Sequence, residues 1–191
     1  MIWVGPNCMT AQISDILRWE HEEWAICAIE CEWPFHPSTA FGLQPEAHCT
    51  ACWRGFFGFF GISENRLRLE ELHVFLNEPG PVVEGIVGYE DLYGAVCYEG
   101  LVYPIGYSGR LLLGADFIDE LYVHMGIQRP HCYRKVIELV CEDGVIVGRS
   151  DHGVLAEAVR LHRFGEKRSR APTPLARGLS PFVREAFSLP Q

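Results

Sequence analysis

The strongest constraint on the fold is the pair Asp143-Gly144, which lies between two runs of apolar and β-branched residues, "YRKVIELVCE" and "VIVGRSD". Aspartate and glycine adopt the positive φ angles that a two-residue type I′ turn requires. The sequence therefore predicts an antiparallel hairpin here. A chain built around such a hairpin is expected to contain further strands that pair with it.

Two other segments show the alternation of a half-buried strand. Residues 24–33, "WAICAIECEW", alternate with a period of two. Residues 52–76 predict a second hairpin, with its turn at 63–65. The leucines of its second strand change parity part-way along, and we expect a β-bulge at residues 70–71 to correct the register.

Helical spacing occurs at both ends of this β-rich region. Ile13, Ile16 and Leu17 predict a short N-terminal helix over residues 11–20, and residues 153–164 predict a C-terminal one. We therefore expect a mainly β fold: an antiparallel β-sandwich or partly open barrel flanked by two helices.

The length of 191 residues suits one core. Residues 1–164 are predicted to form a single β-rich domain, and residues 165–191 a basic tail that contains Pro and Gly. The spacing of Phe182, Val183 and Phe187 allows this tail to dock on the domain.

Charge is divided unevenly along the chain. Residues 1–159 carry a formal charge of −14 and residues 160–191 carry +5, which gives the total of −9. An acidic body favours a basic protein partner and repels nucleic acid, except through the basic tail. The sequence also allows a homodimer. No apolar run is long enough to cross a bilayer and no export signal precedes the domain, so the expected location is the cytoplasm, with the eight cysteines reduced.

Four cysteines offer an alternative to simple packing. Cys27 and Cys31 precede Cys49 and Cys52 at spacings close to those of a structural zinc site, with His36 or His48 able to replace one thiol. However, Cys27 and Cys31 fall within a strand pattern, where cysteine packs as a small apolar residue. We therefore favour no cofactor, with zinc as the alternative. A redox role for Cys49 and Cys52 is the weakest interpretation.

Candidate catalytic and ligand-binding residues are few. His124 is near Asp116 and Tyr122 in the sequence, but their spacing matches no catalytic motif, so a structural role is favoured. Arg54 and Arg110 have the chemistry to bind an anionic ligand, although an internal ion pair is the simpler expectation for each.

Several motifs together have a familiar pattern. The segments "TACWRGFFGFFGI", "LRLEEL", "YSGRLLLG", "YVHMG" and "VIELVCEDGVIVG" cover roughly residues 48–148. They resemble a set of uncharacterised bacterial proteins with a Thr-x-x-Trp-Arg-Gly strand, a Leu-x-Leu strand and a closing Asp-Gly or Asn-Gly hairpin. This resemblance implies a β-rich fold and no activity.

The sequence thus leaves three functions open. The first is a non-enzymatic interaction or regulatory protein, such as an antidote or an accessory subunit, that uses an acidic surface to bind a basic partner. The second is a hydrolase or transferase with a pocket around His124. The third is a module that binds zinc or a small anion. The absence of a catalytic motif favours the first and argues against an enzyme.

Overall fold

The computed structural model describes residues 11–124, 126–164 and 178–188. The strands are β1 (Ile16–Trp19), β2 (Glu22–Ile29), β3 (Phe56–Ser63), β4 (Arg66–Val74), β5 (Tyr89–Glu90), β6 (Val96–Pro104), β7 (Gly109–Phe117), β8 (Tyr133–Glu142) and β9 (Val145–Asp151). The helices are α1 (Pro37–Phe41), α2 (Gly153–Phe164) and α3 (Pro181–Phe187), with 3-10 turns η1 (Asp119–Leu121) and η2 (Pro130–Cys132). The predicted mainly β class is confirmed.

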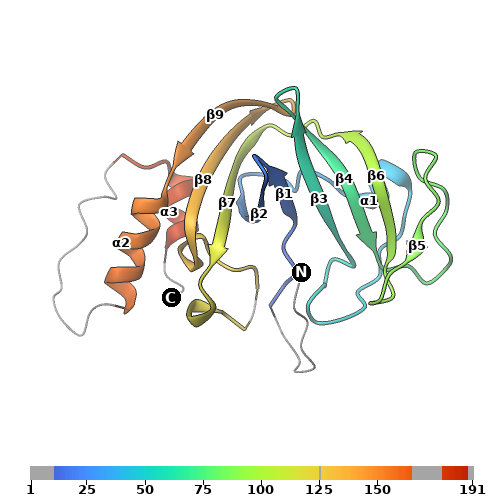
Figure 1. Cartoon of the computed structure of the whole chain (residues 1–191), viewed down its shortest axis with the longest axis horizontal. Coiled ribbons are helices and arrows are strands. Elements are labelled where there is room, and N and C mark those ends of the chain that lie inside the picture. The colour runs from blue at the N-terminus through green and yellow to red at the C-terminus, as the bar shows by residue number, and fades with distance from the viewer. Residues whose placement is uncertain (1–10, 125, 165–177, 189–191) are drawn as a thin grey trace.

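Within the described residues, seven strands close into a barrel (Figure 1). Their order is β3-β1-β2-β7-β8-β9-β4, and β4 pairs with β3 to complete the ring. The barrel is mixed, because β1 and β3 are parallel whereas the other neighbours are antiparallel. Strand β6 pairs with β4 and extends the sheet beyond the barrel, and the short strand β5 pairs with the outer edge of β6. The predicted sandwich is therefore wrong, and the predicted alternative of a partly open antiparallel barrel differs in that this barrel is closed and has one parallel pair.

Strand β1 explains why the sequence did not predict a closed barrel. The sequence predicted a helix over residues 11–20, but Ile16–Trp19 is a strand that pairs with both β2 and β3. Leu17 is fully buried in the barrel interior, while Ile16 packs on the opposite side of the sheet. Three apolar residues fit a helix and a short strand equally well. Because β1 joins β2 to β3, its omission left the sheet open.

The core follows from alternation along the strands. Leu111 and Leu113 of β7 point into the barrel, whereas Leu112 between them points outward into a second cluster. That second cluster is covered by the C-terminal helices, which contribute Ala156, Val183 and other apolar residues. A third, smaller cluster lies around Phe57, Phe59 and Phe75. One interior and two outer clusters thus account for the high apolar content.

The predicted hairpins are confirmed. Asp143 and Gly144 have φ angles of 47° and 76°, and they connect β8 to β9. The β3–β4 hairpin turns at Glu64 and Asn65, both with positive φ.

The predicted bulge in β4 is also present. Glu71 pairs with Phe59 and Leu69 pairs with Phe60, so Glu70 has no partner in the register. The extra residue lets Leu69 and Leu72 both face the interior.

The C-terminal helices also agree with the sequence. Helix α2 covers the predicted residues 153–164. In α3, Val183 and Phe187 are buried, and the hydroxyl of Ser180 accepts a hydrogen bond from the backbone N–H of Val183 as an N-cap. Residues 165–177 and 189–191 of the predicted tail lie outside the described residues. None of the described helices has the length and apolar character needed to cross a membrane.

Candidate functional site

The four cysteines of the zinc alternative are not brought together. Cys27 is buried in the outer cluster beneath α2, whereas Cys52 is buried in the cluster around Phe57. Cys31 and Cys49 are exposed. Strand β2 ends at Ile29, so the strand position predicted for Cys31 is wrong; its φ of 70° marks a chain that has already left the sheet.

Cys49 and Cys52 form a tight turn that precedes β3. The backbone N–H of Cys52 donates to the carbonyl of Cys49 at 3.1 Å. Burial raises the pKa of the Cys52 thiol to about 11. A reactive Cys-x-x-Cys pair needs the opposite shift, because the thiolate is the reactive form. The turn therefore serves to bring the chain into β3.

The weak catalytic candidates face different neighbours. Asp116 forms an ion pair with Lys135 at 3.3 Å on the surface. Tyr122 and His124 contact each other through their rings, edge to face, with centroids 5.3 Å apart. His124 is exposed, and the two depressions lined by Arg18 on the described surface include none of His124, Asp116 and Tyr122. Asp116 is thus paired with Lys135, whereas Tyr122 and His124 contact each other.

Arg54 and Arg110 are engaged in ion pairs, as the simpler expectation had it. Arg54 donates to both carboxylate oxygens of the buried Asp15, at 3.0 and 3.2 Å. Its guanidinium stacks on Trp33, with Cζ 4.1 Å from the ring centroid. Arg110 lies 3.6 Å from Glu30 and 3.9 Å from Glu138. The two arginines therefore have different acidic partners and are not brought together by these ion pairs.

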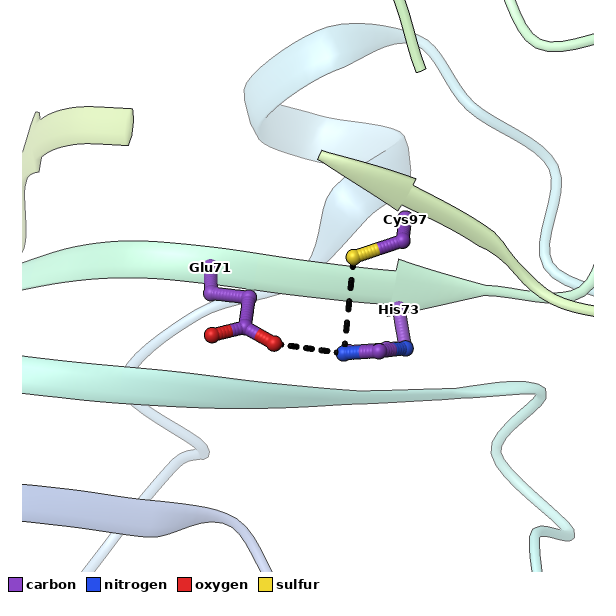
Figure 2. Close-up of side chains that lie close together, drawn as sticks. All are labelled: Glu71, His73 and Cys97. Carbon is purple, nitrogen blue, oxygen red and sulfur yellow. Dashed lines mark hydrogen bonds and ion pairs between the residues drawn. The ribbon is translucent and has the colours of Figure 1, made fainter. Parts of the chain in front are cut away.

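A cluster centred on His73 of β4 was not expected from the sequence (Figure 2). Its Nε2 atom lies 2.7 Å from Oε1 of Glu71 and 3.5 Å from Sγ of Cys97. Its Nδ1 atom lies 2.8 Å from Oδ2 of Asp91. The imidazole ring also stacks on Phe57, with centroids 4.5 Å apart and an angle of 8° between the planes. His73 is therefore contacted at both nitrogens and across one face.

Strand register explains how the cluster forms. His73 pairs directly with Cys97 of β6 and with Phe57 of β3, so these side chains share one outer face of the sheet. Glu71 is two residues from His73 on the same strand and therefore points the same way. The spacing Glu-x-His in a strand is the one sequence signal that could have indicated part of the cluster.

The thiol of Cys97 is in an environment that disfavours ionisation. Burial, with a further contribution from the nearby acids Glu71, Glu99 and Asp91, raises its pKa to about 11. Tyr89, which pairs with Cys97 across β5 and β6, donates from its hydroxyl to Glu99. That hydrogen bond raises the pKa of Tyr89 as well. The thiol is thus not an activated nucleophile.

The segment that runs from the bulge of β4 through β5 and β6 to the start of β7 is acidic, although Arg66 and Arg68 lie just before it on β4. Residues 69–109 contain seven Asp and Glu residues but no Lys or Arg. Four of these acids, Glu78, Glu84, Glu90 and Glu99, are exposed. Exposed apolar side chains lie between them: Val82, Val87, Tyr89, Leu92 and Tyr93. We call these nine residues the acidic end. In Figure 1, β5 lies at the side of the molecule opposite α2 and α3.

No family model matches the chain, and neither a curated protein nor a solved structure matches it. The resemblance noted for residues 48–148 therefore stays a prediction. Functional inference must come from the chemistry of the surface and of the His73 cluster.

Proposed function

We propose that this protein is a non-enzymatic interaction or regulatory protein, of the antidote or accessory-subunit kind, that binds a basic partner protein through its acidic end. The observation that carries this proposal is the absence of Lys and Arg from residues 69–109, where seven acids are present. This one segment supplies −7 of the net charge of −9. Such a concentration of one sign attracts a surface of the other sign.

The acids are available for a partner. Among the described residues, Glu78, Glu84 and Glu90 have no ion pair with Lys, Arg or His, unlike Glu71, which pairs with Arg18 at 2.8 Å. Their mutual repulsion is relieved when a cationic surface approaches. The exposed negative charge therefore favours association and speeds the encounter, and it does so most strongly at low ionic strength.

The apolar residues of the acidic end favour a protein as the partner. Leu92 is 98% exposed and Val87 is 76% exposed. Exposed apolar side chains grouped on one part of a surface are typical of contact sites, where their burial adds to affinity. A nucleic acid is disfavoured here because its phosphates would meet carboxylates. A basic protein surface with apolar residues complements both features.

The experiment that tests this proposal is zero-length carbodiimide cross-linking, which joins carboxylates to lysine amines, in an extract of the organism that encodes the chain. Mass spectrometry then maps the cross-linked residues. We expect one basic partner, joined through Glu84, Glu90 or Glu99 and released at high salt. A Glu84→Gln/Glu90→Gln/Glu99→Gln variant should lose that partner. A matched Asp119→Asn/Glu120→Gln/Glu142→Gln variant, with the same loss of charge in another part of the chain, should keep it.

Several results would contradict the proposal. These are a partner retained equally by both variants, cross-links confined to acids outside residues 69–109, or cross-links only between copies of this chain. Retention of no partner at low salt would also contradict it, since electrostatic attraction is strongest under that condition.

A further inference from the structure

The His73 cluster combines three kinds of ligand atom. One carboxylate oxygen of Glu71, one imidazole nitrogen of His73 and the sulfur of Cys97 all lie within 4.8 Å of one another. Figure 2 shows the three side chains meeting on one side of the sheet. In the described part of the chain, this is the one group of three such residues whose ligand atoms converge. Nitrogen, sulfur and oxygen together are the donor set typical of Zn²⁺.

The cluster is positioned by rigid elements. All three ligands lie on the paired strands β4 and β6, where His73 is directly opposite Cys97 and Glu71 is opposite Glu99. Little backbone movement is needed to bring these atoms together. A site built on paired strands is more fixed in geometry than one on loops.

A second ring of contacts orients the histidine. Oδ2 of Asp91 lies 2.8 Å from Nδ1 of His73. Oδ1 of Asp91 accepts hydrogen bonds from the backbone N–H groups of Tyr93 and Ala95, at 2.8 and 3.0 Å. A carboxylate on the far nitrogen of a metal-ligating histidine fixes the tautomer and raises the basicity of the ligand. With the proton on Nδ1, the lone pair of Nε2 points towards Glu71 and Cys97.

That tautomer leaves a gap that a cation would fill. An unprotonated Nε2 and the Glu71 carboxylate are both acceptors, yet they lie 2.7 Å apart. Either a proton or a metal ion must lie between them for the contact to be favourable. The carboxylates of Asp91 and Glu71, 2.8 and 2.7 Å from the two ring nitrogens, give the cluster a negative charge that a bound cation would balance.

The distances suit a tetrahedral ion with one small adjustment. With bond lengths of about 2.0 to 2.3 Å, tetrahedral nitrogen and sulfur ligands lie about 3.5 Å apart. The observed separation of Nε2 and Sγ is 3.5 Å. The oxygen of Glu71 would have to move by roughly half an ångström. Glu71 also lines an open depression of about 420 Å³, so solvent adjoins the cluster.

We propose that Glu71, His73 and Cys97 bind one divalent metal ion, Zn²⁺ by its donor preference, with Asp91 as the residue that orients His73 and with a fourth position open to solvent. Binding displaces the thiol proton of Cys97, which leaves to solvent, and no electron is transferred. This site is distinct from the four-cysteine alternative and does not depend on the proposed partner.

The test uses the full-length protein, stripped of metal, and titrates it with Zn²⁺ and with Co²⁺ as a spectroscopic probe. We expect one equivalent of Zn²⁺ to bind. Co²⁺ should give the thiolate-to-metal charge-transfer band and the intense visible bands of a tetrahedral site. Zn²⁺ should also raise the melting temperature, because it binds the folded state.

Variants locate the site. Cys97→Ser should abolish the thiolate band, and Asp91→Asn should weaken metal affinity by roughly 10- to 100-fold, as changes behind a ligand usually do. The matched control is Cys49→Ser/Cys52→Ser, which should leave the band and the stoichiometry unchanged. Since Asp91→Asn retains all three ligands, it tests the site even if Cys97→Ser fails to fold.

The proposal is overturned if the protein binds less than about 0.1 equivalent of metal, because a genuine zinc site has an affinity high enough to be nearly filled in this titration. It is also overturned by a cobalt spectrum without the thiolate band, or by a band that survives Cys97→Ser and disappears in the control. A metal affinity unchanged by Asp91→Asn would remove the role assigned to Asp91.

Discussion

Arg54 donates from both of its terminal nitrogens to Asp15, a fully buried carboxylate that lies 39 positions earlier in the chain. The same carboxylate accepts from the backbone N–H of Gly58 at 2.8 Å. Burial raises the pKa of Asp15, while the charge of Arg54 opposes that rise. The pair joins the segment before β1 to the segment that leads into β3, and so supports the parallel contact between these two strands.

Arg54→Ala is expected to lower the free energy of unfolding by about 3 kcal/mol, because it leaves Asp15 buried without a charge partner. This value is at the low end of the usual cost of breaking a buried ion pair, because the side chain of Arg54 is 30% exposed. Urea-induced unfolding at neutral pH measures the change. The double variant Asp15→Asn/Arg54→Met should recover part of the loss. If both variants are equally unstable, the ion pair is not the cause.

Gly144 is required by space as well as by conformation. Its φ is 76°, and a Cβ added there would lie 2.2 Å from the carbonyl oxygen of Ile105. We expect Gly144→Ala to cost about 3 kcal/mol, from left-handed strain and from the shift that the clash forces. Gly94 is the matched control, because its φ is 81° and its Cβ would meet nothing within 4 Å. Gly94→Ala should therefore cost only about 1 kcal/mol of strain. Equal losses in chemical denaturation would contradict this explanation.

His131 makes stability depend on pH. Burial, together with the charges of Arg163, Arg129 and Arg160, lowers its pKa to about 4. Its Nε2 accepts from Arg163 at 2.9 Å. The unfolded chain takes up a proton below about pH 6.5, whereas the folded protein does so only near pH 4. The stabilising contribution is thus complete above pH 6.5 and declines as the pH falls.

Between pH 7 and pH 5 this one group should lower the unfolding free energy by about 2 kcal/mol. His131→Gln should remove this contribution to the change of unfolding free energy with pH. The exposed His162 on α2 provides the control, since His162→Gln should leave the slope as it is. Urea titrations at a series of pH values give the comparison, and a slope that His131→Gln does not change would refute the assignment.

How far the sequence predicts this fold depends on how many interpretations each pattern allows. The Asp143-Gly144 turn has one good interpretation, and the hairpin was predicted with its correct turn residues. The parity change in β4 also has one, which is a bulge. By contrast, residues 16–19 are too few to separate a strand from a helix, and their parallel pairing with β3 is a long-range contact that no local pattern encodes. Because β1 was not predicted as a strand, the closure of the barrel was not predicted either.

The candidate sites were harder to predict because they depend on register between distant strands. Arg54 was correctly expected to form an ion pair, but its partner Asp15 was hidden in a segment interpreted as a helix. The contact between His73 and Cys97 depends on β4 pairing with β6 at one register, 24 positions apart in the chain. Sequence spacing instead directed attention to Cys27, Cys31, Cys49 and Cys52, which share a motif-like spacing and no common site.

Val87 and Val154 permit a direct test of the acidic end. They are the same residue type and are 76% and 73% exposed. Val87 comes two residues before β5 and Val154 lies in α2, and these two elements are on opposite sides of the molecule in Figure 1. Substitution of either by Ser should change the unfolding free energy by less than about 0.5 kcal/mol, as expected for surface positions. Val87→Ser should nevertheless weaken binding of the cross-linked basic partner by about tenfold, because a buried valine contributes roughly 1.5 kcal/mol. Val154→Ser should leave the affinity unchanged when both are measured by titration calorimetry. If the two variants bind alike, the apolar residues among the acids do not form part of the contact, and charge alone must account for the association.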